Sequence, residues 1–134
     1  MKLLLDTHIL LWTLFDPSRL GASLKDTLGN PEYLVFASDI SFWEISMKFA
    51  LGKLSLGTAQ PQELPAIVLS AGFSILPIGS DLLASYHLLE LSRNRHRDPF
   101  DRLLIWQAIS SRMTLCTHDH IIRQHSIKGL AVLL

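Results

Sequence analysis

Carboxylate side chains stand at two places in this chain where buried strands are expected to end. Asp6 follows the apolar run Leu3-Leu4-Leu5, and Asp119 follows a second strand-like run from Met113 to Thr117. Ligands of parallel α/β sheets bind beyond the carboxyl ends of the strands, so these two acids are expected to share one pocket. Carboxylates crowded at a poorly solvated site repel each other, and a divalent cation relieves that repulsion. The pattern therefore predicts an acidic, cation-binding pocket.

Three further acids lie on helices expected next to these strands. Glu44 is near the start of a helix, and Asp98 and Asp101 open the long helix that precedes Met113. Hard cations such as Mg²⁺ take oxygen ligands, lower the pKa of a bound water and stabilise charge on a phosphoryl oxygen. Each acid also has a structural alternative. Glu44 could pair with Lys48 one turn later, and the other two suit the N-cap and first turn of a helix.

The two acids that follow strands have structural alternatives as well. Asp6 could be a solvated loop residue, although its apolar neighbours from Leu3 to Leu11 favour a functional role. Asp119 could cap a short helix after it, and the sequence leaves both interpretations of Asp119 open.

Length, composition and charge limit the kinds of protein that this chain can be. The chain has 134 residues, of which 49% are hydrophobic and 18% charged, which indicates one globular domain with a substantial core. Lys plus Arg and Asp plus Glu number 12 each, so no global charge attracts nucleic acid. A local cluster of basic residues could hold RNA phosphates. The two members beside the acids are favoured for this role, whereas the others could simply form a solvated loop. The cluster comprises Arg93, Arg95, His96, Arg97 and Arg102, and Arg97 and Arg102 are the favoured pair.

Several chemical classes are disfavoured. Cys116 is the only cysteine, which excludes an intramolecular disulfide and a multi-cysteine zinc site, and its place in a strand indicates a buried hydrophobe. His118 and His120 bracket Asp119, but no motif supplies a third imidazole for a transition metal. Core packing is expected for the tryptophans, Trp12, Trp43 and Trp106. Asp6 interrupts the apolar N-terminus, so neither a signal peptide nor a membrane span is expected, and the cytoplasm is the default location.

Strand-like and helix-like segments alternate along the chain. This alternation predicts an α/β fold with a parallel sheet of about four or five strands flanked by helices. The expected strands cover residues 2–5, 33–37, 73–76, 113–117 and 130–134. The expected helices cover residues 9–15, 22–28, 39–51, 62–71, 80–92, 98–111 and 120–125, with Ser38 or Asp39, Ser80 and Asp98 as caps.

Four local strings resemble the PIN-domain ribonucleases and, taken together, the VapC toxins of bacterial type II toxin–antitoxin modules. The strings are Leu5-Asp6-Thr7-His8, Ser41-Phe42-Trp43-Glu44-Ile45, His96-Arg97-Asp98-Pro99-Phe100-Asp101-Arg102 and Thr117-His118-Asp119. They follow the family's order, so the resemblance covers residues 1–134 as a single PIN domain. Trp106 departs from the pattern, since a small residue is more usual there, and this departure concerns the packing of its helix.

The resemblance implies a set of site residues. The acids that gather around Mg²⁺ or Mn²⁺ in this family correspond to Asp6, Glu44, Asp101 and Asp119, with Asp98 as a further acid that is either a ligand or only a helix cap. Substrate-binding candidates are Thr7 and Thr117, which match hydroxyl positions that orient the site, together with Arg97 and Arg102 from the basic cluster.

The resemblance further implies an Mg²⁺- or Mn²⁺-dependent endoribonuclease that leaves 5′-phosphate and 3′-hydroxyl ends. It would be the toxin of a toxin–antitoxin module, a homodimer neutralised by a VapB-like antitoxin. The helices over residues 9–28 and 40–51 are expected to offer the antitoxin a groove. A non-catalytic PIN-like scaffold protein is the alternative, although the lost carboxylates that would mark it are all present. An aspartyl phosphatase ranks last, because His8 stands where a second Asp is usual.

Overall fold

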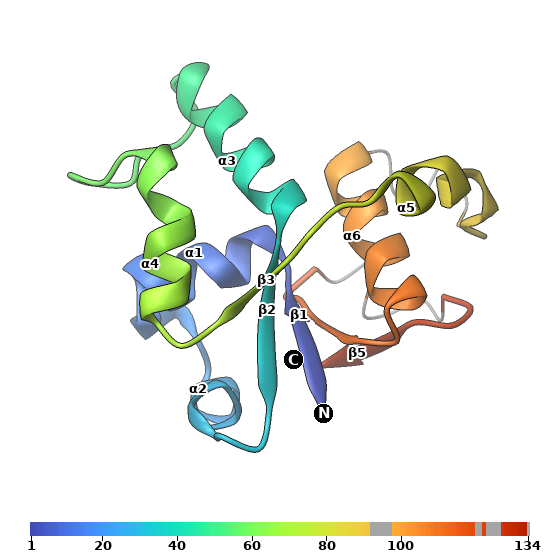
Figure 1. The fold of residues 1–134 in the computed structure, drawn as a ribbon. Coiled ribbons are helices and arrows are strands. Elements are labelled where there is room, and N and C mark those ends of the chain that lie inside the picture. The colour runs from blue at the N-terminus through green and yellow to red at the C-terminus, as the bar shows by residue number, and fades with distance from the viewer. Residues whose placement is uncertain (92–97, 120–121, 123–126, 134) are drawn as a thin grey trace.

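A five-stranded parallel sheet organises the molecule. The computed structural model describes residues 1–91, 98–119, 122 and 127–133. The strand order is β3-β2-β1-β4-β5, and all neighbouring strands run parallel (Figure 1). The strands are β1 (Lys2–Leu5), β2 (Leu34–Ser38), β3 (Ser74–Leu76), β4 (Thr114–Cys116) and β5 (Ala131–Leu133). The predicted α/β fold and the five predicted strands are thereby confirmed.

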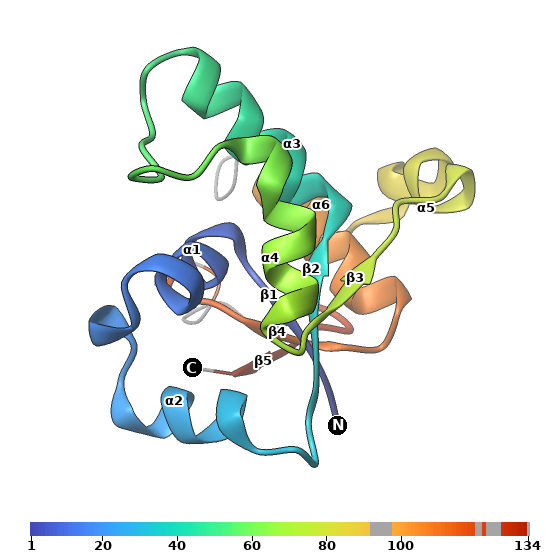
Figure 2. The same ribbon diagram turned by 60° about the vertical axis from the view of Figure 1, so that its left-hand side comes forward.

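Helices lie on both faces of this sheet, as Figures 1 and 2 show from two sides. Strand β1 explains why both faces are covered: Leu3 and Leu5 belong to one core cluster and Leu4 to the other, because successive side chains of a strand point to opposite faces. The α-helices are α1 (Thr7–Phe15), α2 (Ala22–Gly29), α3 (Asp39–Ala50), α4 (Leu64–Ser70), α5 (Ser80–Ser85) and α6 (Pro99–Ser110). Short 3₁₀ turns are η1 (Pro17–Arg19), η2 (Pro61–Glu63) and η3 (Tyr86–Leu88).

Helices α3 and α6 begin at side-chain caps that the sequence predicts. Ser38 Oγ accepts a hydrogen bond from the Ile40 amide at 3.1 Å, and Asp98 Oδ1 accepts one from the Phe100 amide at 2.8 Å. Helix α3 is followed by Gly52 at φ +72°, a left-handed conformation that glycine adopts without strain. Both helices therefore start at fixed places beside the carboxyl ends of the strands.

One predicted helix is much shorter than expected. The segment predicted as a helix over residues 80–92 is α5, which ends at Ser85 and continues only as the 3₁₀ turn η3. Ser85 Oγ bonds back to the Asp81 carbonyl at 2.7 Å and also accepts from Trp106 Nε1 at 3.1 Å. Such back-bonding loosens a helix, and the contact with α6 holds the chain there. Ser80 is the first helical residue rather than the cap, because Gly79 occupies the N-cap position.

Other differences at element boundaries are small. The helix predicted from residue 62 begins at Leu64, as α4, because residues 61–63 form the turn η2. Two predictions, the polar loop over residues 93–97 and most of the helix over residues 120–125, fall outside the described residues. Among the helices that the structure describes, none combines the length and apolar character required to cross a bilayer.

Candidate active site

Three of the predicted acids line one pocket at the carboxyl edge of the sheet. Asp6 follows β1, Asp119 follows β4, and Asp101 lies in the first turn of α6. Together with Thr117 they line a cavity of about 250 Å³. The other lining residues are His8, Trp12, His118 and Ile122. Strands β1 and β4 are neighbours in the sheet, and this adjacency brings together acids that are 113 positions apart in the chain.

Asp6 is held at the junction of β1 and α1. Its amide donates to the Cys116 carbonyl at 2.9 Å, and its Oδ1 accepts from the Ile9 amide at 2.8 Å, so it is also the N-cap of α1. Burial raises the pKa of the Asp6 carboxyl, and the hydrogen bonds from Ile9 and Thr117 oppose this shift. The Thr117 hydroxyl also accepts from the Asp119 amide at 3.0 Å, so one hydroxyl connects both acids that follow strands.

The carboxyl of Asp101 is strongly affected by its surroundings. Its pKa is raised from 3.8 to about 7, first by burial and then by four other carboxylates, those of Asp98, Glu44, Asp119 and Asp6. The other four acids selected from the sequence therefore lie within electrostatic reach of Asp101. Their mutual repulsion gives this pocket a strong preference for a positive charge.

Glu44 is buried and does not line the pocket. The residue is only 2% exposed, and its Oε1 accepts from Thr7 Oγ1 at 2.7 Å. Ser41 Oγ is 3.0 Å from the same Thr7 hydroxyl, and Glu44 Oε2 accepts from Lys48 Nζ. The ion pair considered as the structural alternative for Glu44 is therefore present. Thr7 holds the buried carboxylate rather than facing the cavity.

Lys48 brings a positive charge to these acids. Burial lowers the pKa of its ammonium, but the hydrogen bond and charge of Glu44, together with carboxylates of α6, outweigh burial and raise the pKa above 10.5. The ammonium therefore stays charged at neutral pH.

Two predicted site residues have mainly structural contacts. Asp98 caps α6 and does not line the pocket, although its charge contributes to the raised pKa of Asp101. Asp119 Oδ1 accepts a hydrogen bond from the Ile122 amide at 3.3 Å, as expected for a capping residue, which is one of the two interpretations that the sequence left open. The Asp119 side chain also lines the pocket.

Arg102, the one predicted arginine within the described residues, does not line the pocket. Arg102 Nε donates to Tyr86 Oη at 2.8 Å, and its Nη2 donates to the Leu91 carbonyl at 3.3 Å. Both partners lie on the segment between α5 and α6. Arg97 falls outside the described residues, as do the other members of the basic cluster that precede Asp98.

Sequence reasoning missed three aromatic rings on one wall of the pocket. The ring centroids of Trp12 and His118 are 5.1 Å apart, and those of His8 and Trp12 are 6.2 Å apart. His118 Nε2 is buried without a hydrogen-bond partner in the part of the chain that the structure describes. The spacing of His8 and Trp12, one helical turn apart just after Asp6, was the available signal.

The donors around the pocket suit a hard divalent cation. The carboxylates of Asp6, Asp101 and Asp119 and the Thr117 hydroxyl supply hard oxygen donors, beside the imidazoles of His8 and His118. Mg²⁺ uses one or two carboxylates and keeps several waters. Within the described ranges, no group of three or more His, Cys, Asp or Glu side chains is placed so that it could hold a metal ion as it stands. Thiolate ligation is disfavoured because burial raises the pKa of Cys116 to about 12, which confirms Cys116 as an inert core residue.

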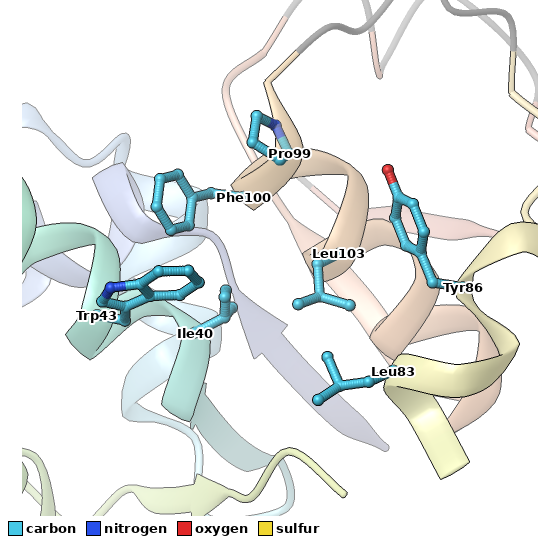
Figure 3. A pocket seen from close by; sticks show the side chains of 7 residues that line it. All are labelled: Ile40, Trp43, Leu83, Tyr86, Pro99, Phe100 and Leu103. Carbon is cyan, nitrogen blue, oxygen red and sulfur yellow. The ribbon is translucent and has the colours of Figure 1, made fainter. Parts of the chain in front are cut away.

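A second hollow, an apolar groove, is bordered by α3, α6 and the segment formed by α5 and η3. It has a volume of about 270 Å³ and is shown in Figure 3, where Trp43 and Phe100 face each other edge to face at 5.2 Å. Its lining consists of Ile40, Trp43, Leu83, Tyr86, Pro99, Phe100 and Leu103. Trp43 is 62% exposed, so its predicted place in the core is wrong, because its indole lies on the face of α3 that borders the groove. Trp12 and Trp106 are partly buried and pack against the two core clusters.

Comparisons with known proteins agree with this architecture. A search of curated proteins finds no match. Among solved structures, VapBC2 from Rickettsia felis bound to a promoter DNA fragment matches with a TM-score of 0.67 and 20% identity, covering 99% of this chain and 98% of that chain. DNA-bound VapBC from Salmonella typhimurium matches with a TM-score of 0.67 and 16% identity, covering 99% and 97%.

A third solved structure, VapBC-1 from nontypeable Haemophilus influenzae, matches with a TM-score of 0.60 and 18% identity, covering 99% of this chain and 97% of that chain. At these identities the likeness concerns the fold. A family model described as the PIN domain matches residues 3–128, nearly the whole chain. This chain therefore belongs to the PIN domain family.

Proposed function

We propose that this protein is an Mg²⁺- or Mn²⁺-dependent endoribonuclease and the toxin of a toxin–antitoxin module. The observation that carries the proposal is the convergence of Asp6, Asp101 and Asp119 on one pocket, where burial and repulsion between carboxylates raise the pKa of Asp101 to about 7. Membership of the PIN domain family supports a nuclease, and the fold likeness to VapBC complexes supports the toxin role.

The residues of the pocket have distinct roles in this proposal. Asp6, Asp101 and Asp119 hold the cation, and the Thr117 hydroxyl fixes the first and last of them relative to each other. A divalent cation bound there supplies Lewis acidity and a water of lowered pKa. Glu44 and Asp98 do not line the pocket, but their negative charges act on Asp101. Water attacks the phosphorus in line and the bond to O3′ breaks, which leaves 5′-phosphate and 3′-hydroxyl ends.

A VapB-like antitoxin is the proposed inhibitor. The matched structures are VapBC complexes, and an arginine of an antitoxin would satisfy crowded carboxylates through charge-assisted hydrogen bonds. We place the reaction in the cytoplasm, where such an RNA substrate and antitoxin are available.

A second copy of the chain is the proposed occupant of the apolar groove. The groove is lined without charged side chains, and Trp43 and Leu83, 62% and 54% exposed, border the hollow on the same face. A two-fold interface needs one self-complementary surface, and a face that carries both exposed side chains and a hollow provides it.

Cleavage of an RNA mixture with Mg²⁺, with Mn²⁺ and in excess EDTA tests the proposed activity. We expect cleavage with either ion and none in EDTA, because the pocket offers hard oxygen donors. The Asp101→Asn variant should show background cleavage, and Asp81→Asn, which removes an exposed acid from α5, is the matched control. Undiminished cleavage in EDTA would overturn the proposal.

A further inference from the structure

Lys48 makes an unusual ion pair for two residues one turn apart on a helix. Its Nζ donates to Glu44 Oε2, and the side chains are 33% and 3% exposed, respectively. Exposed pairs of this spacing contribute little to stability, because water solvates both partners. Here the carboxylate is buried, and a buried charge that loses its partner is strongly destabilising.

Both oxygens of Glu44 are occupied. Oε1 accepts from the Thr7 hydroxyl, and Oε2 accepts from the Lys48 ammonium. Thr7 immediately follows Asp6, and Asp6 lines the acidic pocket while Glu44 does not. The carboxylate of Glu44 is therefore committed to protein donors, and it acts on the pocket through the position of Thr7.

The ammonium also lies within electrostatic reach of two acids on another helix. Asp98 and Asp101, both at the start of α6, interact with its charge. Lys48 thus contacts one member of the acidic cluster directly and two others through space, as a cation bound among these acids would do.

We propose that Lys48 is a positioning residue that takes the place of a metal ion at Glu44, leaving the exchangeable cation to the pocket of Asp6, Asp101 and Asp119. The inference rests on the proposed function only in treating that pocket as the cation site. It predicts that removal of the ammonium frees Glu44 Oε2, and that a divalent ion then binds where the ammonium was.

Calorimetric titration with Mn²⁺ tests this inference by counting ions bound per chain. We expect Lys48→Gln to bind one more Mn²⁺ than the unaltered protein, and Lys48→Arg to bind the same number as the unaltered protein. In EDTA, Lys48→Gln should melt roughly 5–10 °C lower, because a buried carboxylate has lost its cation, and Mn²⁺ should restore most of this loss. Lys53→Gln, which removes an exposed lysine just after α3, is the control of equal charge change.

The double variant Glu44→Gln/Lys48→Gln tests whether the additional Mn²⁺ of Lys48→Gln binds at Glu44. It removes the buried charge as well as its partner, so it should melt near the unaltered protein in EDTA and bind no additional Mn²⁺. An equal Mn²⁺ count for Lys48→Gln and the unaltered protein would overturn the inference. If Lys48→Gln is unfolded without metal, recovery of its helical circular dichroism on adding Mn²⁺ supports the inference. No recovery, while the double variant folds, overturns it.

The difference in ion count does not depend on the nuclease proposal. An unaltered chain that binds no Mn²⁺ and cleaves no RNA would overturn the proposed function. The count for Lys48→Gln would still decide whether the ammonium occupies a cation position.

Discussion

Two opposing electrostatic effects act on the carboxyl of Asp101. It is an acid in the first turn of α6, where the helix dipole favours a negative charge, yet burial and four neighbouring carboxylates raise its pKa to about 7. If Asp101 holds the cation as proposed, a proton and the metal ion compete for this carboxyl near neutral pH. Without metal, the ionised form of Asp101 lowers the stability of the folded chain.

The pH dependence of stability follows from the sign of this shift. A carboxyl whose pKa is raised on folding stabilises the folded state below pH 3.8, and this stabilisation is lost as the pH rises to about 7. In EDTA at pH 8, Asp101→Asn should melt roughly 4 °C higher than the unaltered protein, because an amide cannot ionise. Calorimetry over a pH series should show the difference disappear below pH about 4. A difference that is constant with pH would contradict the assignment.

Asp6 has a structural role and a proposed chemical role, which two substitutions separate. Asp6→Ala removes the N-cap of α1 as well as the charge, and loss of such a cap costs about 1 kcal/mol. Asp6→Asn keeps a capping side chain. Both variants should lose RNA cleavage and growth inhibition, whereas melting should drop clearly only for Asp6→Ala.

An exposed acid provides the comparison for Asp6. Asp26→Asn, on α2, should retain growth inhibition and melting temperature. A folded Asp6→Asn protein that is still toxic would remove Asp6 from the proposed site.

At the scale of elements, the side-chain amide of Gln107 connects α6 to the carboxyl ends of two strands through hydrogen bonds. Gln107 Oε1 accepts from the Ser38 hydroxyl at the end of β2, and its Nε2 donates to the Pro77 carbonyl, just after β3, at 3.2 Å. Gln107 is 1% exposed, so water cannot replace these bonds. The position of Asp101 on α6 depends on this anchorage.

Gln107→Leu should destabilise the protein by about 1–3 kcal/mol, because it leaves buried polar partners unsatisfied. RNA cleavage should fall as well, since α6 carries Asp101. Chemical denaturation of this variant, of Ser38→Ala and of the double variant should give non-additive losses, as expected for residues in contact. Ser110→Ala, at an exposed position of the same helix, should change little. Additive losses would show that the hydrogen bond between the two side chains contributes nothing.

The sequence predicted the elements well where the signals were local. Ser38 and Asp98 act as caps, and the apolar runs that end at Leu5 and before Thr117 form buried strands. The early end of α5 was not predictable, because it depends on a contact between Ser85 and Trp106, 21 residues apart. The exposure of Trp43 was also missed, since periodicity cannot distinguish a core face from a face that borders a groove.

At the scale of the whole molecule, the apolar groove predicts association. We expect a dimer at micromolar concentration, measured by light scattering coupled to size exclusion. Trp43→Ser should weaken dimerisation by about 30-fold, the typical effect of losing a central aromatic contact. Leu69→Ser, which changes a 57% exposed leucine on α4, should leave the dimer intact. An unaltered chain that is monomeric at this concentration would contradict the proposed interface.

The sequence by itself determined which residues are candidates for chemistry and which elements carry them. Acid types, apolar runs and capping residues are local properties, so the α/β class and the acids at Asp6, Asp101 and Asp119 were accessible from the sequence. Glu44 and Asp98 were accessible as well, and for all five acids the sequence left a structural alternative beside the chemical one.

Only the tertiary structure decided what each acid contacts. Strand order places β1 beside β4 and so brings Asp6 and Asp119 to one pocket. The packing of α3 against α1 places the Thr7 hydroxyl against the Glu44 carboxylate. It also directs Arg102 to Tyr86 instead of the pocket. These outcomes depend on distances between residues far apart in the chain, and local patterns of residue type do not specify such distances.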